Sequence, residues 1–502
     1  GGLIWFGEGK WYPGEPVPRW AYGIFWRNDG YPMWRSSSTQ ADPAKPGGFT
    51  QEDSGRLMKE IASVLRIADD CVIPACEDVE YYRWKLAALP VHEEPEEFNE
   101  ETASLERKTL AQLEKRGLEV PTGYVLPIFV SKTANRWVAA EWKLKRGTLF
   151  LIPGASAMGF RLPLDSIREA TADDVIKERS PMDTDWEALD PNPLASYFGD
   201  LAECHDEWIP RTALTAECRE GRLHVFLPPV SRLEEYLELL AAVELAAERI
   251  NVSVVIEGYE PPRDPRVRNL KVTPDPGVIE VNVQPASSWE ELVSNTGRLY
   301  EAARQSRLGA EKFMLDGRHT GTGGGNHVVI GASTPAESPF LRRPDVLASL
   351  IAFWQHHPGL SYLFSGLFIG PTSQAPRVDE GRDDRLFELD IALETLHRGV
   401  AEPYLVDRTL RNLLTDLTGN THRAEICIDK LFSPDSSTGQ LGLLELRGFE
   451  MPPHRQMALV QSLLVRALIA RFWERPYRHK LIRWGTMLHD RFLLPHYVKN
   501  DL

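Results

Sequence analysis

Three glutamates lie inside or beside apolar segments of the sequence, where burying an ionised carboxylate without a partner is costly. Glu217 follows Thr-Ala, Glu280 stands in Val-Ile-Glu-Val-Asn-Val, and Glu445 stands in Leu-Leu-Glu-Leu-Arg. Carboxylate oxygens together with one imidazole suit Mg²⁺ or Mn²⁺. With His327 these glutamates therefore form the predicted metal-ligand set, although each of them also fits the polar outer face of a half-buried sheet.

A glycine-rich segment precedes that histidine and runs Asp-Gly-Arg-His-Thr-Gly-Thr-Gly-Gly-Gly-Asn-His over residues 316–327. It is not a Walker A loop, because no Gly-Lys-Ser/Thr follows, and it leads into a strand rather than a helix. Glycine lets the backbone approach a ligand closely. The polar residues Asp316, Arg318, His319 and Thr320 just before the glycines favour ATP or phosphate binding over a simple hairpin turn. The residues predicted to bind in this way are Gly323, Gly324, Gly325, Asn326 and Arg318.

Three arginines supply the cationic half of a phosphate chemistry. Arg377 and Arg382 follow a loop rich in Gly, Ser and Pro, and Arg447 stands two residues after Glu445. A guanidinium can hold phosphoryl or carboxylate oxygens with forked hydrogen bonds, so all three are candidate catalytic residues. Acidic neighbours between residues 379 and 384 leave surface ion pairing as an equal alternative for Arg382.

The elements that must position these residues alternate irregularly between strands and helices. Strand character is predicted over 123–164, 214–227, 251–256, 278–283 and 328–330, with a strand pair near 423–447. Helices are predicted over 51–67, 232–250, 289–307, 345–357, 384–397 and 453–474. This irregular order favours an α+β fold over a doubly wound sheet.

Capping signals mark two of the predicted helix starts. Ser231 and Glu234 match a capping box, and the Ser-Ser pair before Glu290 and Glu291 matches two overlapping ones. Helix initiation therefore competes with metal binding as the explanation of Glu290.

The length of 502 residues suggests two to four domains. An acidic, proline-containing connector over 166–200 favours a division into an N-terminal region over 1–200 and a catalytic domain over 201–502. The N-terminal region is rich in Trp, Gly and Pro, which is typical of short strands and turns.

Composition excludes several classes of protein. The chain has 57 Lys and Arg against 72 Asp and Glu, a net charge of −15, which argues against a nucleic-acid binder. No window of about 20 apolar residues predicts a membrane span. Five cysteines without a Cys-x-x-Cys pair argue against a zinc ribbon or a disulfide scaffold and favour a reducing cytoplasm. The glutamate-rich run at 93–101 is typical of a solvated face.

The motifs resemble those of the glutamine synthetase and glutamate–cysteine ligase superfamily. The segment ending in Asn326-His327 is similar to its Gly-x-Gly-x-His hairpin, and Glu445-Leu-Arg447 to its late Glu-x-Arg strand. The strands around Glu217 and Glu280 resemble its metal-binding strands. The resemblance implies an antiparallel sheet with helices packed on one face, and an arginine at 447 that steadies a phosphate. Thr215 departs from the Glu-x-Glu pattern of the first strand, which removes one ligand.

Over nearly its whole length the chain more closely resembles a bacterial family of amidoligase-like proteins. The motifs that carry this resemblance are the Trp-Tyr-Pro-Gly-Glu-Pro opening, the Pro-Asp-Pro-Gly-Val-Ile-Glu-Val-Asn-Val run and the glycine-rich segment. Members commonly form the C-terminal half of transglutaminase-like proteins, which implies a transglutaminase-like peptidase domain in the same polypeptide.

The resemblance implies an ATP- and Mg²⁺-dependent carboxylate–amine ligase that works through an acyl phosphate. Its substrates would be small-molecule or peptide carboxylates and amines. Two alternatives stay open: a non-catalytic docking or specificity domain with a ligase-like fold, and a metal-dependent hydrolase that uses the same carboxylates.

Overall fold

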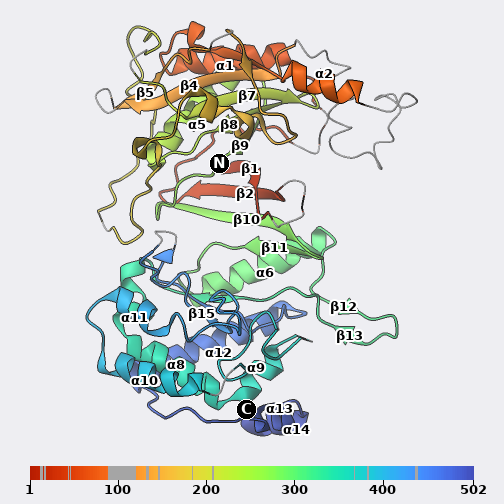
Figure 1. The fold of residues 1–502 in the computed structure, drawn as a ribbon, viewed down its shortest axis with the longest axis vertical. Helices are drawn as coiled ribbons and strands as arrows, with labels where there is room; N and C mark the ends of the chain where they lie inside the picture. The colour runs from red at the N-terminus through yellow and green to blue at the C-terminus, as the bar shows by residue number, and fades with distance from the viewer. Residues whose placement is uncertain are drawn as a thin grey trace. The chain divides into compact units, whose positions relative to one another are not determined.

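The computed structural model describes the chain except for residues 12–14, 16–17, 43–44, 46, 89–119, 132–134, 145–146, 184, 206–207, 367, 382–383 and 436–438. The glutamate-rich run at 93–101 and the candidate Arg382 lie outside the described residues. The chain forms two compact units (Figure 1): unit 1 comprises 1–179, 187–274 and 281–284, and unit 2 comprises 180–186, 275–280 and 285–502. Unit 1 continues beyond the predicted division at residue 200, because the strands that follow residue 200 are part of the same sheet as the first strands.

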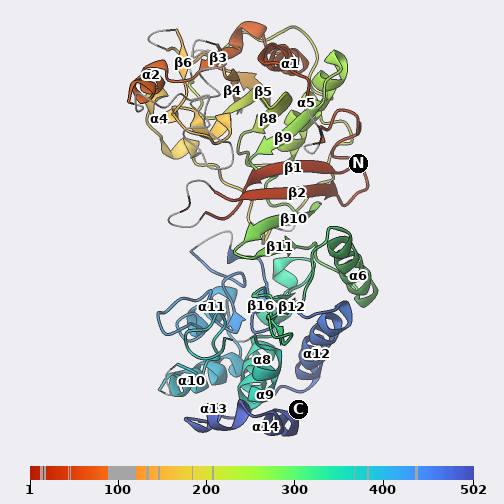
Figure 2. The ribbon, with the colours of Figure 1, turned by 90° about the vertical axis from the view of Figure 1, so that its right-hand side faces the viewer.

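A large mixed sheet has the strand order β11-β10-β2-β1-β9-β8-β7-β4-β3-β6, with β5 paired to β4. The antiparallel sheet that the resemblance implied is therefore only partly found, since β1 and β8 both run parallel to β9, and β3 runs parallel to β6. Figure 2 shows β9, β1, β2 and β10 in this order. The strands are β1 (Leu3–Glu8), β2 (Trp20–Arg27), β3 (Ile73–Cys76), β4 (Gly123–Ser131), β5 (Arg136–Ala139), β6 (Leu149–Phe150), β7 (Ala213–Arg219), β8 (Arg222–Leu227), β9 (Val254–Gly258), β10 (Val267–Asp275) and β11 (Val278–Asn282).

Two long helices of unit 1, α1 (Gln51–Val64) and α5 (Leu233–Ile250), pack against each other and share one core with the strands. The short helices α2 (Val79–Ala87) and α4 (Leu164–Ile167) also belong to this unit. The predicted capping box of α5 is wrong by one residue: Glu235, not Glu234, accepts hydrogen bonds from the backbone N–H groups of Ser231 and Arg232, at 3.2 and 3.1 Å. Glu234 instead lies 2.8 Å from Arg266.

Unit 2 consists mainly of helices around a second core. The presence of these helices and of the large sheet in one chain confirms the predicted α+β class. The helices of unit 2 are α6 (Trp289–Gln305), α7 (Pro339–Arg342), α8 (Pro344–His356), α9 (Pro358–Phe364), α10 (Arg385–Arg398), α11 (Pro403–Leu410), α12 (Arg455–Glu474), α13 (Met487–Phe492) and α14 (Pro495–Asp501). Its strands are the hairpin β12 (Lys312–Phe313) and β13 (His319–Thr320), and a three-stranded sheet of β14 (Val328–Ile330), β16 (Leu444–Leu446) and β15 (Ile426–Cys427).

The start of α6 confirms helix capping at the Ser-Ser pair. The Ser288 side chain accepts a hydrogen bond from the Glu291 backbone at 3.1 Å, and the Glu291 carboxylate accepts one from the Ser287 backbone at 2.8 Å. Glu290 is exposed in the first turn, where the positive end of the helix dipole stabilises a negative charge.

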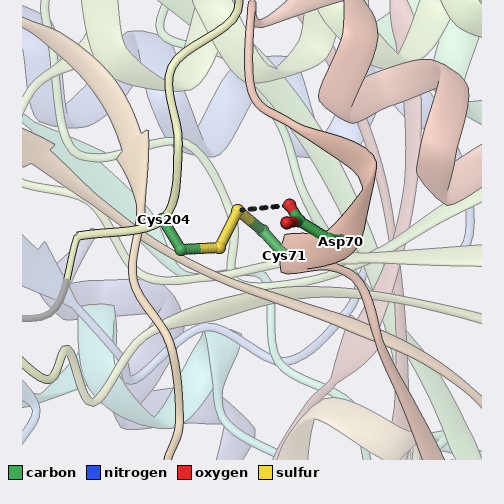
Figure 3. Close-up of side chains that lie close together, drawn as sticks. All are labelled: Asp70, Cys71 and Cys204. Carbon is green, nitrogen blue, oxygen red and sulfur yellow. Dashed lines mark hydrogen bonds between the residues drawn. A yellow bond between two sulfur atoms is a disulfide. The ribbon is translucent and has the colours of Figure 1, made fainter.

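One pair of cysteines bears on the prediction of a reducing cytoplasm, a compartment in which disulfides are rare. Cys71 and Cys204 form a disulfide, and the Cys71 sulfur lies 3.8 Å from an oxygen of Asp70 (Figure 3). This is a single link between two segments and not a disulfide scaffold. The spacing of the cysteines could not reveal it, because the partners are 133 residues apart in sequence. Among the described residues, none of the helices combines the length and apolar character that crossing a bilayer requires.

Candidate functional site

The central strand β16 of the small sheet carries Glu445 between two core leucines. Leu444 and Leu446 are fully buried in the second core, and Glu445 pairs in register with Val329 of β14 and Cys427 of β15. Side chains alternate across a strand, so Glu445 lies on the face opposite the leucines. The sheet thus separates its apolar core face from a polar face.

Three basic side chains surround the Glu445 carboxylate and with it form what we call the Glu445 group. Oε1 lies 2.9 Å from Nδ1 of His327 and accepts a 2.9 Å hydrogen bond from Arg447, while Oε2 accepts a 3.4 Å hydrogen bond from Lys430. Burial by itself would raise the pKa of Glu445. The His327 hydrogen bond and the charges of Lys430 and Arg447 outweigh burial and lower the pKa to about 2. Three of the four members, Glu445, His327 and Arg447, are predicted site residues.

The glycine-rich segment positions His327 by pairing with the chain that follows β16. The Gly324 carbonyl accepts a hydrogen bond from Met451 at 2.9 Å, and the Asn326 backbone donates to Phe449 at 2.9 Å. A side chain at Gly325 would collide with the imidazole, since a Cβ there would lie 2.5 Å from Nε2 of His327. The Asn326 side chain donates to buried Gln461 at 2.7 Å. Gly323 has a φ of +86°, which favours glycine at this turn.

Beside the Glu445 group lie three residues that the sequence reasoning missed, His422, Cys427 and Asp429, here called the Cys427 triad. Nε2 of His422 lies 3.1 Å from an Arg447 nitrogen, and Nδ1 lies 3.5 Å from Asp429. Arginine can only donate, so Nε2 is the acceptor and a neutral ring carries its proton on Nδ1, facing Asp429. Burial raises the pKa of Cys427 to about 12, and the charges of Asp429 and Glu445 add to this.

A sequence signal for two members of the triad does exist. Cys427 and Asp429 stand two residues apart within the strand pair predicted near 423–447. This spacing is typical of a strand with one polar face, and Cys427 pairs in register with Glu445.

Arg377 lies apart from this group in the contacts that the structure records. It is 3% exposed and pairs with both oxygens of Asp379, at 2.9 and 2.8 Å. It also donates to the backbone carbonyls of Trp354 and Gln355 and to the Ser361 hydroxyl. Since its three nitrogens are all engaged, Arg377 serves here to hold the end of α8 against the loop before α10.

Arg318 also has a local partner. It lies in the turn of the β12–β13 hairpin, is 75% exposed at its side chain, and pairs with Asp316 at 2.6 Å. The structure records no contact between Arg318 and the Glu445 group.

In unit 1, Glu217 belongs to a second buried cluster on neighbouring strands, the Glu217 group of Glu217, Arg219, His224 and Glu257. Glu217 accepts a 2.9 Å hydrogen bond from the Met158 backbone, and Nε of Arg219 lies 3.7 Å from it. Nδ1 of His224 lies 3.0 Å from Glu257, which also accepts a hydrogen bond from Arg219. The sequence reasoning missed Glu257, although it follows the apolar run Val-Val-Ile of β9 and the argument used for Glu217 applies to it.

The two glutamates of this group have opposite pKa shifts. Burial raises the pKa of Glu217, and the Glu257 charge adds to the rise while Arg219 opposes it. Burial acts in the same direction on Glu257, but Arg219 and His224 outweigh it and lower its pKa. The Oε1 atom of Glu257 is buried and has no hydrogen-bond partner among the described residues. A nearby carboxylate and an unsatisfied carboxylate oxygen fit a hard divalent cation.

The fit of Mg²⁺ or Mn²⁺ to the predicted ligands therefore differs between the units. Glu217, with Glu257, offers oxygen donors in unit 1. In unit 2 both oxygens of Glu445 are already bound by basic side chains, so Glu445 does not fit as a metal ligand in this arrangement. Glu280 lies half-buried in β11. The predicted set is thus divided, with Glu217 in unit 1 and Glu280, His327 and Glu445 in unit 2.

Comparison with known sequences places the whole chain in one family. Residues 1–502 match the family described as "Putative amidoligase enzyme (DUF2126)", and the chain belongs to it. No curated protein and no solved structure matches the chain. The closer of the two resemblances expected from the sequence is thereby confirmed.

Proposed function

We propose that this amidoligase-family chain is an ATP-dependent carboxylate–amine ligase in which the Glu445 group contacts phosphate. The observation that carries the proposal is the convergence of His327, Lys430 and Arg447 on one carboxylate at the polar face of the small sheet. The family description supports an amide-forming enzyme, and the arrangement of charge supports ATP as the activating substrate.

The Glu445 group has donor capacity left for an anion. The single negative charge of Glu445 faces two positively charged side chains, Lys430 and Arg447, in addition to the His327 ring. The Lys430 side chain is 45% exposed, and its recorded hydrogen bond to Glu445 is long at 3.4 Å. The Nε of Arg447 is buried and has no acceptor among the described residues. Preorganised donors of this kind stabilise charge that moves during phosphoryl transfer.

The reaction then follows from these donors. A substrate carboxylate oxygen attacks the γ-phosphorus of ATP, the bond to ADP breaks, and an acyl phosphate forms. An amine nitrogen next attacks the acyl carbon, phosphate leaves with the bonding electrons, the nitrogen loses one proton to solvent, and the amide remains. Lys430 and Arg447 hold the phosphoryl oxygens through both steps, while Glu445 acts as a positioning residue for Arg447 and His327. Mg²⁺ or Mn²⁺, when bound, offsets the charge of the polyphosphate.

Titration with Mg²⁺–ATP tests the binding half of the proposal. Arg447→Ala and Lys430→Ala should each weaken ATP binding roughly 10-fold or more, because a hydrogen bond to a charged group contributes about 1.5–3 kcal/mol. Arg398→Ala is the matched control, since Arg398 is an exposed arginine paired with Glu394 on α10. Equal ATP affinity in all four proteins would contradict the site.

Amine-dependent ADP release from a panel of carboxylates and amines tests the chemistry. We expect release by the wild-type chain and its loss in Arg447→Ala. Release that survives both Arg447→Ala and Lys430→Ala would overturn the assignment. No ATP binding at millimolar concentration would instead favour a non-catalytic docking domain, which the saturated Glu445 carboxylate also fits. The transglutaminase-like partner domain and the cytoplasmic location stay predictions.

A further inference from the structure

The Cys427 triad brings a sulfur, a nitrogen and an oxygen donor together beside the Glu445 group. One ligand atom from each of His422, Cys427 and Asp429 lies within 4.8 Å of the other two. In sequence they form His-x₄-Cys-x-Asp. Thiolate, imidazole and carboxylate are the donor types that Zn²⁺ takes in proteins.

The backbone fixes these donors from two sides. Cys427 ends β15, and Asp429 follows two residues later in the turn after the strand. His422 is held by the preceding turn, in which Asn420 accepts a hydrogen bond from the His422 backbone at 2.9 Å and donates its own N–H to Asp416 at 3.0 Å. The strand end and the two turns that flank it therefore bring the three donors together.

Asp429 has an oxygen that the protein leaves unsatisfied. Its Oδ1 is buried and has no hydrogen-bond partner among the described residues, because the closest recorded cation, Nη1 of Arg411, lies 3.8 Å away. Arg411 already has both oxygens of Asp407, at 2.8 and 2.5 Å. A buried carboxylate oxygen without a donor is costly, and a bound cation would satisfy it.

We propose that Cys427, His422 and Asp429 bind a divalent transition metal of the Zn²⁺ type, with the fourth position open to water or another ligand. Thiolate and carboxylate together balance the two positive charges of the ion. Three protein ligands and an open position are typical of a reactive rather than a purely structural site. The half-exposed His422 side chain, 55% exposed, provides the entry path, while Cys427 is 1% exposed.

Metal binding changes the protonation of the triad in a defined way. The thiol of Cys427 loses its proton to solvent as the metal–sulfur bond forms. His422 binds through Nδ1, gives up the proton there and carries one on Nε2 instead, so the ring stays neutral. A protonated Nε2 no longer accepts from Arg447, which keeps its hydrogen bond to Glu445. The metal therefore releases one proton in total and frees Arg447 from His422.

Cobalt serves as the probe, because Co²⁺ bound to a thiolate gives an intense ligand-to-metal charge-transfer absorption. Titrating the full chain, with its Cys71–Cys204 disulfide intact, with Co²⁺ should produce this band with one ion bound, and Zn²⁺ should displace it. Cys427→Ser should abolish the band, and Asp429→Asn should weaken binding by roughly 10-fold or more. Cys218→Ser is the matched control, since Cys218 is a free, half-buried thiol outside the triad.

His422→Gln keeps the test valid if a substitution of buried Cys427 disturbs folding, because His422 is largely exposed. It should also weaken Co²⁺ binding roughly 10-fold or more, with an unchanged circular dichroism spectrum. Calorimetry in two buffers of different ionisation enthalpy should give about one proton released per ion. A Co²⁺ spectrum without a thiolate band, a band that Cys218→Ser abolishes, or His422→Gln with wild-type affinity would overturn the proposal. None of these measurements depends on ATP, so they are independent of the proposed ligase activity.

Discussion

Glu217 of unit 1 and Glu445 of unit 2 share the local pattern Glu-x-Arg on a strand, and both side chains are buried. Their pKa values nevertheless shift in opposite directions. Arg447 donates to its own strand neighbour Glu445 at 2.9 Å, with Lys430 and His327 on the same carboxylate. Arg219 donates to Glu257 on another strand, and its Nε stays 3.7 Å from Glu217. The cations that converge from other segments, rather than the local pattern or burial, decide whether such a glutamate is stably ionised.

Replacing the arginine of each Glu-x-Arg pattern with alanine should give the largest difference between the two regions, measured as the loss in free energy of unfolding. Arg219→Ala leaves two buried carboxylates for which His224 is the one basic neighbour recorded among the described residues, so we expect a loss of about 3 kcal/mol in the free energy of unfolding. Arg447→Ala leaves Glu445 with Lys430 and His327, and we expect a loss of about 1–2 kcal/mol. Urea unfolding at pH 7 measures both. Equal losses would show that the two arginines have equivalent roles.

Acid should affect the Glu445 group with a definite sign. The folded pKa of about 2 lies below the ordinary glutamate value of 4.5, so the stabilisation is present above pH 4.5 and is lost as the pH falls towards 2. It amounts to roughly 3 kcal/mol. Unfolding curves between pH 3 and 7 should therefore show a smaller pH dependence for Glu445→Gln than for the wild type. Parallel curves would mean that the three basic neighbours do not hold the carboxylate ionised.

Glu217 should respond to pH in the opposite direction. Its raised folded pKa means that ionisation destabilises the folded state, so the unfavourable contribution grows as the pH rises through and above 4.5. Glu217→Gln should change stability by about 1 kcal/mol or less at pH 5 and become relatively more stable towards pH 8. A variant that loses stability relative to the wild type as the pH rises would show that Glu217 is held ionised like Glu445.

The smallest effect concerns the support of His327. Asn326→Ala removes the 2.7 Å hydrogen bond to Gln461, whose side chain is 1% exposed. We expect a loss of about 1 kcal/mol in the free energy of unfolding and little change in the pKa of Glu217. Thermal unfolding measures the loss, and an unchanged midpoint would mean that the glycine-rich segment holds His327 without this contact.

Local sequence was sufficient to predict several of the elements but not the contacts between them. The helices predicted over 345–357 and 453–474 occur as α8 and α12, and the strands around Glu217 and Glu445 occur as β7 and β16. Their signals lie within a few residues of each other, as periodicity and capping require. Lys430 contacts Glu445, and His422 contacts Arg447, from the turns on either side of β15. Such contacts depend on strand register, which a single sequence does not state.

Arg377 is a second example of a residue whose surroundings the local sequence does not determine. Its neighbour Asp379 is two residues away, as Glu445 is from Arg447, so the two arginines look alike in sequence. In the structure the Arg377 pair is enclosed by the carbonyls at the end of α8, whereas Arg447 stands on a polar face. Burial of the pair depends on the packing of α8, a property of the whole unit.

The position of β1 has a consequence for how the chain folds. Trp5 of this first strand pairs with Ile256 of β9, and β1 lies between β2 and β9 in the sheet. On the ribosome, β1 therefore has no second neighbour until residue 256 has been synthesised. Closing such a long loop is slow compared with forming a local hairpin. Until then the β1 edge of the β1–β2 hairpin is unpaired. An unpaired strand edge can pair with another chain, so this edge of the nascent chain needs protection during synthesis.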